Sequence, residues 1–578
     1  MKKSRTIAFI SLIILFGLIY FFSFPNLNPL YADGLSFWCF FITLTVIVFW
    51  LFGSAGRIKS ASNVFTADFK EKKAYKNIKL GKSGPVYIAV IALPWLVLIL
   101  GGFFSSAIFH SAAYRDQMPQ PATSQFSSDV QPLDVNQLPI VDHDLALNLA
   151  DKMLGSKSSL GSQVTLGDPT IQKVNGKLVW VVPLEDSGFF KWLSNMDGTP
   201  GYIIVSATNP SDVTYVDTST AFSESACAPA ASTTPATVVN YLIKYQPNAY
   251  FLDNLNRHAR LAGGEFTGLT DYSFEIDDTG RPYWVVTTYA NEVGFSLPEA
   301  TGAIIIDATT GKAKKYSKDE ILKNPDTKWV DRIQPTSYIG NQLNNRGQYV
   351  HGIFNFSNKE KFQTSGKYAI VYNNNTCYYF TGRTSVGSDE SATGFFMVDM
   401  RTKKALLYEM SGATDSAAQQ SAEGKVQNFK YTASFPLITN VNGEPTYFMT
   451  LKDNSGLIKQ YAFVSVKNYT AVGTGETITD ALDDFNLSLS STTGGSVINS
   501  QSTKLSLEGT ISRIASEQQN SITIYEFMLT EQPGTIFTAN YNVSTQLALT
   551  NAGDKVKITY TKSSNSVGTF DNEALDLK

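Results

Sequence analysis

The chain has 578 residues, with 47 Lys and Arg against 50 Asp and Glu, and a mean hydropathy of −0.08. This length exceeds what a single hydrophobic core serves, so we expect several domains. Basic residues exceed acidic ones by eight up to residue 110, and acidic residues exceed basic ones by 11 after it. An acidic surface repels polyphosphates, which argues against nucleic acid as a partner.

Three apolar stretches lie near the N-terminus, at residues 7–24, 35–52 and 86–109. Each has about the length needed to cross a hydrocarbon layer of ~30 Å. The first lacks the small-residue cleavage site of a signal peptide, and two further stretches follow it. We therefore predict a membrane domain over residues 1–110 with three transmembrane helices.

The charges of the loops predict the orientation of these helices, because Lys and Arg are retained on the cytoplasmic side. Residues 1–5 carry three basic residues, residues 53–85 carry eight, and residues 25–34 carry none. We predict a multi-pass protein of the cell membrane with a cytoplasmic N-terminus and with residues 111–578 extracytoplasmic. The basic loop is read as a determinant of topology, with a site for lipid headgroups or a partner as the alternative.

Residues 111–140 contain four prolines among Gln, Ser and Thr and show no hydrophobic periodicity. Such a composition is typical of a semi-extended linker. We expect it to hold the folded outer part away from the bilayer.

Beyond the linker the chain repeats one order of elements. In the first copy, residues 141–220, a helical pattern over Asp144–Leu154 precedes two strands, each beginning near a glycine, at residues 177–182 and 201–208. In the second copy, residues 234–325, we expect a helix from Thr234 that carries Val238, Leu242 and Tyr245, followed by strands at residues 279–286 and 302–309.

Two weaker copies follow, at residues 326–424 and 425–495. Their strands are predicted at residues 375–380, 394–399, 442–448 and 460–466. In these copies we expect the helix to follow the strands, over residues 414–422 and 477–487.

The first two copies share a G-x-x-x-W-V-V strand, which begins at Gly176 and Gly280, and the second copy continues with G-x-I-I-I-D-A-T-T-G-K from Gly302. With the helix before them, these strands resemble PepSY-type domains, small α+β units found outside bacterial membranes. The resemblance covers two copies well and two poorly. It implies binding or regulatory work at the cell envelope, often linked to peptidases, and provides no catalytic residues.

Residues 503–578 have a different order of elements: five predicted strands, with a short helix over residues 543–549 before the fourth strand. This order resembles an OB-fold barrel. Tyr525, Phe527 and Phe537 could stack on a sugar or a base, but core packing is the favoured interpretation. The predicted fold class is therefore α+β: three N-terminal transmembrane helices, tandem PepSY-like antiparallel units and a small C-terminal OB-like β-barrel.

No group of residues indicates catalysis, a metal or a cofactor. The four histidines are scattered without a second His or Cys at ligand spacing, and His143 is interpreted as part of a helix start. Trp180 and Trp284 are interpreted as core anchors. Cys227 and Cys377 could pair, but they fall in different copies, so two isolated thiols are the simpler interpretation.

The segment from Lys328 to Phe356 departs from the repeat and is rich in Trp, Tyr, Arg and Asn. Packing between the second and third copies would explain it. The alternative is a surface for a protein partner, since Trp, Tyr and Arg dominate interfaces; its candidate residues are Trp329, Arg332, Tyr338, Tyr349 and His351.

The function predicted from these features is that of a non-enzymatic, membrane-anchored extracytoplasmic protein. It would bind or regulate an envelope partner such as a peptidase, a wall enzyme or a secretion component. The alternative is a structural subunit of a membrane assembly, and an enzyme with an unrecognised site is a third hypothesis.

Overall fold

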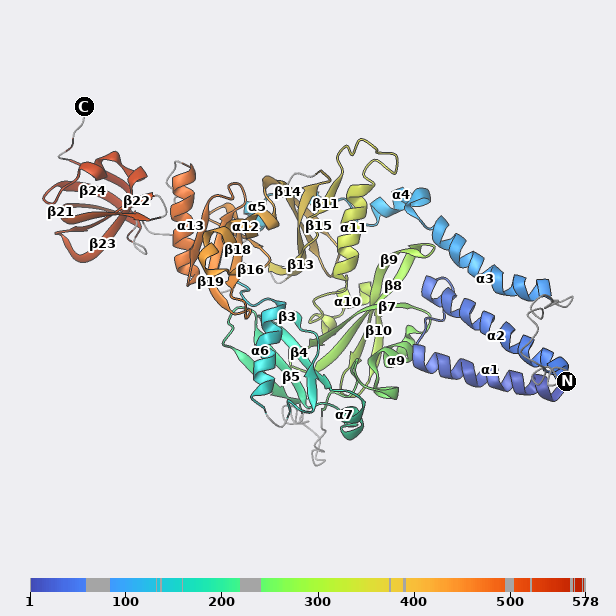
Figure 1. Ribbon diagram of the computed structural model, residues 1–578. Coiled ribbons are helices and arrows are strands. Elements are labelled where there is room, and N and C mark those ends of the chain that lie inside the picture. Colours follow the sequence, from blue (N-terminus) through green and yellow to red (C-terminus); the bar gives the residue numbers. More distant parts are fainter. Residues whose placement is uncertain are drawn as a thin grey trace, which may run out of the picture.

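The computed structural model describes residues 2–58, 84–130, 133–135, 138–157, 160–218, 241–373, 376–387, 391–493, 504–519, 522–561, 565, 567–573 and 575. The chain forms an elongated mixed α+β molecule (Figure 1). The N-terminal helices lie at one end and a C-terminal sheet at the other.

Three apolar helices form the N-terminal end: α1 (Lys2–Ser23), α2 (Ala32–Ile58) and α3 (Gly84–Phe104). Two of them contain a stretch that is long and apolar enough to cross a membrane, Ala32–Trp50 and Pro85–Phe104. In α1 the apolar stretch is shorter, Phe9–Ser23, because the helix begins with polar and charged residues. Two of the three predicted spanning helices therefore have the length and composition needed to cross a membrane, and α1 has a shorter apolar stretch.

Four sheets follow, and each is built on an antiparallel meander; in sheet 3 a sixth strand, β1 (Ala122–Thr123), adds in parallel to the last strand. Sheet 1 contains β2 (Val164–Leu166), β3 (Thr170–Val174), β4 (Lys177–Asp186), β5 (Gly201–Ser206) and β6 (Val213–Asp217). Sheet 2 contains β7 (Gly268–Ile276), β8 (Pro282–Val293), β9 (Ser296–Asp307) and β10 (Ala313–Ser317).

Sheet 3 contains β11 (Phe362–Thr364), β12 (Ala369–Asn373), β13 (Thr376–Ser385), β14 (Ser391–Asp399) and β15 (Ala405–Ala413). Sheet 4 contains β16 (Thr432–Ala433), β17 (Leu437–Val441), β18 (Glu444–Lys452), β19 (Ile458–Ser465) and β20 (Val472–Gly475). In three of the sheets the edge strand is interrupted, so two short strands pair with the same neighbour. These are β2 and β3 on β4, β11 and β12 on β13, and β16 and β17 on β18.

Local details confirm that sheets 1 and 2 repeat one another. The indole Nε1 of Trp180 donates to the carbonyl of Val141, and that of Trp284 donates to the carbonyl of Tyr245; both bonds span 39 residues. Steric crowding explains why each copy has a glycine at the start of its second predicted strand. A Cβ at Gly201 or Gly302 would overlap a carbonyl oxygen of the next strand, and both glycines have positive φ angles of 148° and 157°.

The helices are distributed differently from the sequence prediction. Helix α6 (His143–Gly155) packs on sheet 1 as expected. Leu242 and Tyr245 are not helical, because this stretch is bonded into sheets 1 and 2, through Ile243 to Thr199 and through the amide of Tyr245 to Ala308. Residues 219–240, with Val238 and Cys227, lie outside the described residues.

Helices are found at both positions predicted for the weaker copies, as α12 (Asp415–Lys425) and α13 (Ile478–Thr493). Helix α13 follows the strands of sheet 4 and covers β19 and β20, as predicted. Helix α12 follows the strands of sheet 3 but packs mainly on sheet 4, which corrects the expectation for the third copy. Helix α11 (Thr336–Gln348) precedes sheet 3 and packs on β11.

The four sheets form a ring through shared hydrophobic cores (Figure 1). Tyr202 of sheet 1 lies 6.0 Å from Phe274 of sheet 2, and Phe395 of sheet 3 lies 5.8 Å from Tyr447 of sheet 4, measured between ring centroids. Sheets 4 and 1 share a third core with α6 and α13. Ile333 joins sheets 2 and 3, since its side chain packs on sheet 2 and its amide donates to Met400.

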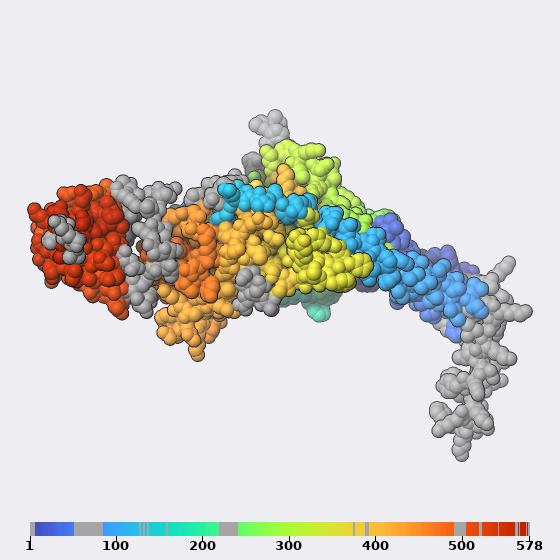
Figure 2. Space-filling model, turned by 90° about the horizontal axis from the view of Figure 1, so that it is seen from above, coloured from blue at the N-terminus to red at the C-terminus, as the bar shows by residue number. Residues whose placement is uncertain are grey.

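The predicted linker is a packed strap, and this corrects the expectation of a free spacer. It contains α4 (Ala107–Asp116), β1 (Ala122–Thr123) and α5 (Phe126–Asp129). Strand β1 pairs in parallel with β15, and the ring of Phe126 lies edge-on to Tyr408 at 5.8 Å. Figure 2 shows the strap as light blue and cyan atoms along the yellow and orange parts of the surface. Apolar side chains such as Phe126 anchor it despite its polar composition.

Sheet 2 contacts the N-terminal helices directly. The hydroxyl of Tyr31, in the connection between α1 and α2, donates to the carbonyl of Tyr289 at 2.8 Å. At the end of α3, the hydroxyl oxygen of Ser105 accepts from the amide of Phe295 at 3.0 Å. The β8–β9 hairpin therefore lies against the apolar helices.

The C-terminal sheet has the strand order β23-β22-β21-β24-β25. Its strands are β21 (Lys504–Gln519), β22 (Ile522–Leu529), β23 (Gln532–Asn540), β24 (Lys555–Thr561) and β25 (Val567–Asn572). Within the described residues no ladder joins β23 to β25, so a closed barrel is not formed by strand pairing. Short 3-10 turns replace the predicted helix over residues 543–549, and Phe527 and Phe537 are core residues.

The remaining helices are short: α7 (Phe189–Ser194) follows β4, α9 (Leu255–Ala259) precedes β7, and α10 (Lys318–Lys323) follows β10. Helix α9 places Leu255 and Ala259 in the core shared by sheets 1 and 2.

Candidate binding cleft between the four sheets

A cleft of about 540 Å³ opens between the sheets, and the first strands of all four contribute to its lining. These strands provide Ile171 of β3, Asp271 of β7, Ile370 of β12 and Leu437 of β17. Each of them is an edge strand of its sheet. Because an edge strand has unpaired backbone groups on one side, the ring brings four strand edges around one cleft.

Side chains, and not strand pairing, hold these edges together. Gln172 on β3 bonds the backbone of Ile276 on β7 through both ends of its amide, at 2.8 and 2.9 Å. The carboxylate of Asp331 accepts from the amide of Lys173 at 2.8 Å and from the hydroxyl of Tyr372 on β12 at 2.9 Å. The cleft therefore has rigid walls without a continuous sheet across it.

Arg332 is the cationic group of the cleft lining. Among the residues that the structure describes, no hydrogen bond or ion pair engages its guanidinium. Burial lowers its pKa, but the carboxyl groups of Glu275 and Asp271 outweigh this effect, so the pKa is raised overall. Since a guanidinium has five N–H donors, Arg332 retains its capacity to bind a planar anion such as a carboxylate.

The carboxyl groups around Arg332 are partly neutralised by burial. Burial raises the pKa of Glu275 to about 7, against a smaller opposing effect of Arg332. One oxygen of Glu275 accepts from Ser273 at 2.8 Å, and the other has no partner in the described chain. Burial also raises the pKa of Asp331, although two hydrogen bonds oppose it. Burial thus disfavours the charged forms of Glu275 and Asp331, while the carboxyl group of Asp271 still acts on Arg332.

The opposite wall is acidic and comes from sheets 1 and 4. His143 is the first residue of α6, and its ring nitrogens contact Asp144 at 3.0 Å and Asp168 at 3.1 Å. Burial lowers the pKa of His143, but these two carboxylates raise it overall. Asp142 caps α6 through the amide of Leu145 and pairs with Lys452 of sheet 4. His143 is thus a structural cation at a helix start, as predicted.

The lining suits binding better than catalysis. The histidine is occupied by two carboxylates, so it is not poised as a base for a hydroxyl of the cleft such as Ser434. Apolar side chains, including Ile140, Ile171 and Phe435, alternate with polar ones along the cleft. An extended polypeptide has complementary features, because it offers backbone groups to strand edges and side chains to apolar pockets.

The structure separates the residues that were predicted as a partner surface. Only Arg332 among them lines the cleft. Trp329 stacks on Tyr283 at 4.9 Å, Tyr338 lies edge-on to Tyr289 at 5.9 Å, and Tyr349 lies edge-on to Tyr114 at 5.8 Å. His351 contacts Glu360 at 2.9 Å on the surface. The aromatic members thus pack between elements, which agrees with the packing interpretation of this segment and not with the alternative of a partner surface.

Sequence reasoning missed the contribution of Asp271. This residue occupies a bulge in β7, with a positive φ of 48°, where the pairing register with β8 shifts. The bulge displaces Asp271 from the ladder toward the cleft. No strand was predicted from the sequence over residues 268–276, so there was no reason to select Asp271.

Comparison with known proteins does not identify the chain: no family model matches it, and no curated protein matches it significantly.

Proposed function

We propose that this chain is a non-enzymatic, membrane-anchored extracytoplasmic protein that binds an extended segment of an envelope protein in the cleft between its four sheets. The observation that carries the proposal is the convergence of four strand edges on the unpaired guanidinium of Arg332. The guanidinium favours a segment with a carboxylate, from an acidic side chain or a C-terminus. A peptidase, a wall enzyme or a secretion component would be such a partner.

The membrane anchor is part of the proposal. Helices α2 and α3 are long and apolar enough to span, and the indole of Trp95 on α3 donates to Thr43 on α2 at 3.1 Å. Helix α1 packs beside α2, with Phe16 edge-on to Phe41 at 4.9 Å, which supports a third span. The excess of basic residues in residues 53–85 supports a cytoplasmic N-terminus.

The repeated units are proposed to be PepSY-like, and the last sheet to be OB-like. Equivalent turns support the first proposal. In sheet 2 the carboxylate of Asp307 accepts from the amides of Thr309 and Thr310, both at 2.9 Å. In sheet 3 that of Asp399 accepts from the amides two and three residues later, at 2.8 and 3.0 Å. Contacts between β23 and β25 support a barrel-like curl of the last sheet.

Site-specific photo-crosslinking in cells tests the binding function. A photoreactive residue replaces Ile370 in the cleft or, as a control, the exposed Tyr469. We expect one partner to crosslink from the cleft position only, through a peptide with an acidic residue or a C-terminus. Arg332→Ala should reduce its capture by about tenfold or more, because a charge-assisted contact is lost.

The matched control is Arg513→Ala, which removes one exposed positive charge from the C-terminal sheet. It should leave the capture unchanged. If both variants capture the partner as well as the unmodified chain, the cleft is not its binding site. Crosslinks confined to membrane proteins through α1–α3 would favour the structural subunit of a membrane assembly.

A further inference from the structure

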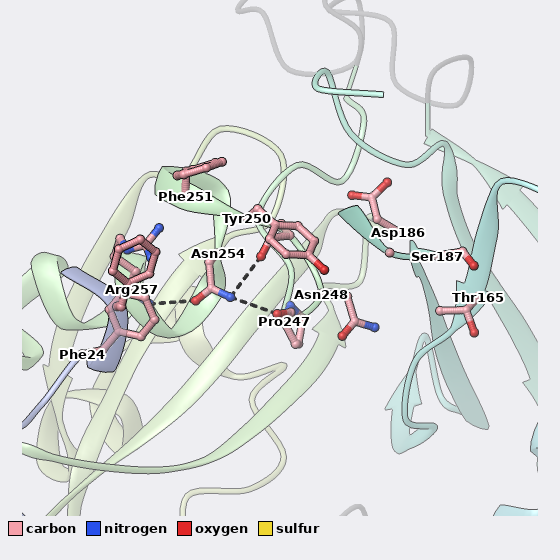
Figure 3. Close-up of a pocket in the computed structure, with 13 residues that line it drawn as sticks. Phe24, Thr165, Asp186, Ser187, Pro247, Asn248, Tyr250, Phe251, Asn254 and Arg257 are labelled. Carbon is pink, nitrogen blue, oxygen red and sulfur yellow. Dashed lines mark hydrogen bonds between the residues drawn. The ribbon is translucent and has the colours of Figure 1, made fainter. Parts of the chain in front are cut away.

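A second cavity, of about 550 Å³, lies between sheets 1 and 2 and the outer end of α1 (Figure 3). Thr165 and Asp186 line it from sheet 1, the segment from Pro247 to Arg257 lines it from the element before sheet 2, and Phe22 and Phe24 line it from the end of α1. It is distinct from the cleft of the four sheets and belongs to the side of the molecule next to the apolar helices.

Asp186 is the unusual group in this cavity. Its side chain is buried, with 1% of the residue exposed, and neither carboxylate oxygen has a hydrogen-bond partner in the described chain. Figure 3 shows the carboxylate projecting from the end of β4 into the space that Tyr250 and Asn248 border. Burying a carboxylate without a partner is costly, so this geometry indicates a missing cation.

Two cations of the described chain near the cavity do not contact this carboxylate. Lys244 pairs with Asp253 at 3.8 Å. Arg257, on the far side of the cavity, donates to the carbonyl of Phe21 at 2.9 Å and stacks on the rings of Phe21 and Phe24, while its Nη1 has no hydrogen-bond partner in the described chain. Burial and Asp253 raise the pKa of Asp186 to about 6, which leaves it largely ionised at neutral pH.

The other walls also suit a cation. The exposed rings of Phe22, Tyr250 and Phe251 border the cavity, and aromatic faces attract cations. Asn254 holds the wall rigid, because its amide donates to Pro247 and Ala249 at 3.0 and 3.1 Å (Figure 3). Phe251 has a positive φ of 50°, a conformation that L residues rarely adopt and that needs support from its surroundings.

We propose that this cavity binds the primary ammonium group of an aminophospholipid headgroup, with Asp186 as the anionic partner. A primary ammonium has the N–H donors that a carboxylate accepts, whereas a quaternary ammonium has none. The lipid source follows from position, since two lining residues belong to the outer end of α1, where headgroups lie if α1–α3 span the membrane. In this respect the inference rests on the anchoring proposed above.

The test uses the full-length chain in nanodiscs of phosphatidylglycerol that contain an equal fraction of either phosphatidylethanolamine or phosphatidylcholine. Lipids that remain bound after gentle release are counted by native mass spectrometry. We expect phosphatidylethanolamine to be retained about tenfold more than phosphatidylcholine. Asp186→Asn should abolish this preference. The control Asp253→Asn should keep it, since Asp253 already has a cationic partner.

Asp186→Asn removes a buried charge without a partner, so it should not lower the thermal midpoint, and lost binding would not reflect unfolding. Retention of the preference in this variant would overturn the ammonium site. Binding of soluble phosphoethanolamine without any lipid preference would overturn the lipid assignment. A failure of the anchoring would show separately, as release of the unmodified chain from cell membranes by alkaline carbonate.

Discussion

The strap offers the clearest test of the tertiary structure, through the substitution Phe126→Ala. Phe126 is 6% exposed and belongs to the core of sheets 3 and 4, where it contacts Tyr408. Truncating a buried Phe to Ala costs about 3–5 kcal/mol. If the whole of this loss destabilises the attachment of the strap, the fraction of molecules with an open strap rises by a factor of about 10² to 5 × 10³.

Hydrogen exchange of the full-length protein in detergent measures this opening. The amide of Ser124 donates to Leu407 and that of Leu133 donates to Asn440 at 3.0 and 2.9 Å, so peptides over residues 122–133 should be protected. Phe126→Ala should remove most of this protection. The control Val135→Ala, at a residue that is 36% exposed, should not. Unprotected amides in the unmodified chain would show that the segment is a free spacer and would refute the reasoning.

Two further predictions concern the repeat and its buried acid. Trp180→Phe and Trp284→Phe each remove one indole hydrogen bond to a backbone carbonyl, so each should lower stability by about 1–2 kcal/mol; thermal unfolding that shows an effect of one substitution only would contradict their equivalence. Burial raises the pKa of Glu275 from its ordinary value of about 4.5 to about 7, so the folded state holds more protons in this interval and stability should fall as the pH rises from about 4.5 to 7. Glu275→Gln should reduce this pH-dependent loss of stability. Part of the loss should remain, because burial also raises the pKa of Glu185 to about 7. Equal thermal midpoints of the variant and the unmodified chain at every pH would contradict the assignment.

The sequence by itself determined the local elements, because their signals are local. Gly302 lies within β9 at a position where a Cβ has no room, and the motif around Trp284 places an indole where it can reach a carbonyl 39 residues earlier. Both requirements are met within one copy of the repeat. The strands of the weaker copies and the acidic character of the outer part were likewise accessible from residue types and spacing.

Only the tertiary structure decided how these elements combine. Helix α12 follows sheet 3 in the chain but packs mainly on sheet 4, because the cores of these sheets are continuous around it. The strap is held by apolar residues scattered through a polar segment, such as Met118, Phe126 and Leu138. Arg332 lines the cleft between the four sheets, whereas Trp329 stacks on Tyr283. The structure therefore makes Arg332 a candidate binding residue and Trp329 a packing residue. Such contacts join residues that are distant in sequence, and no local pattern encodes them.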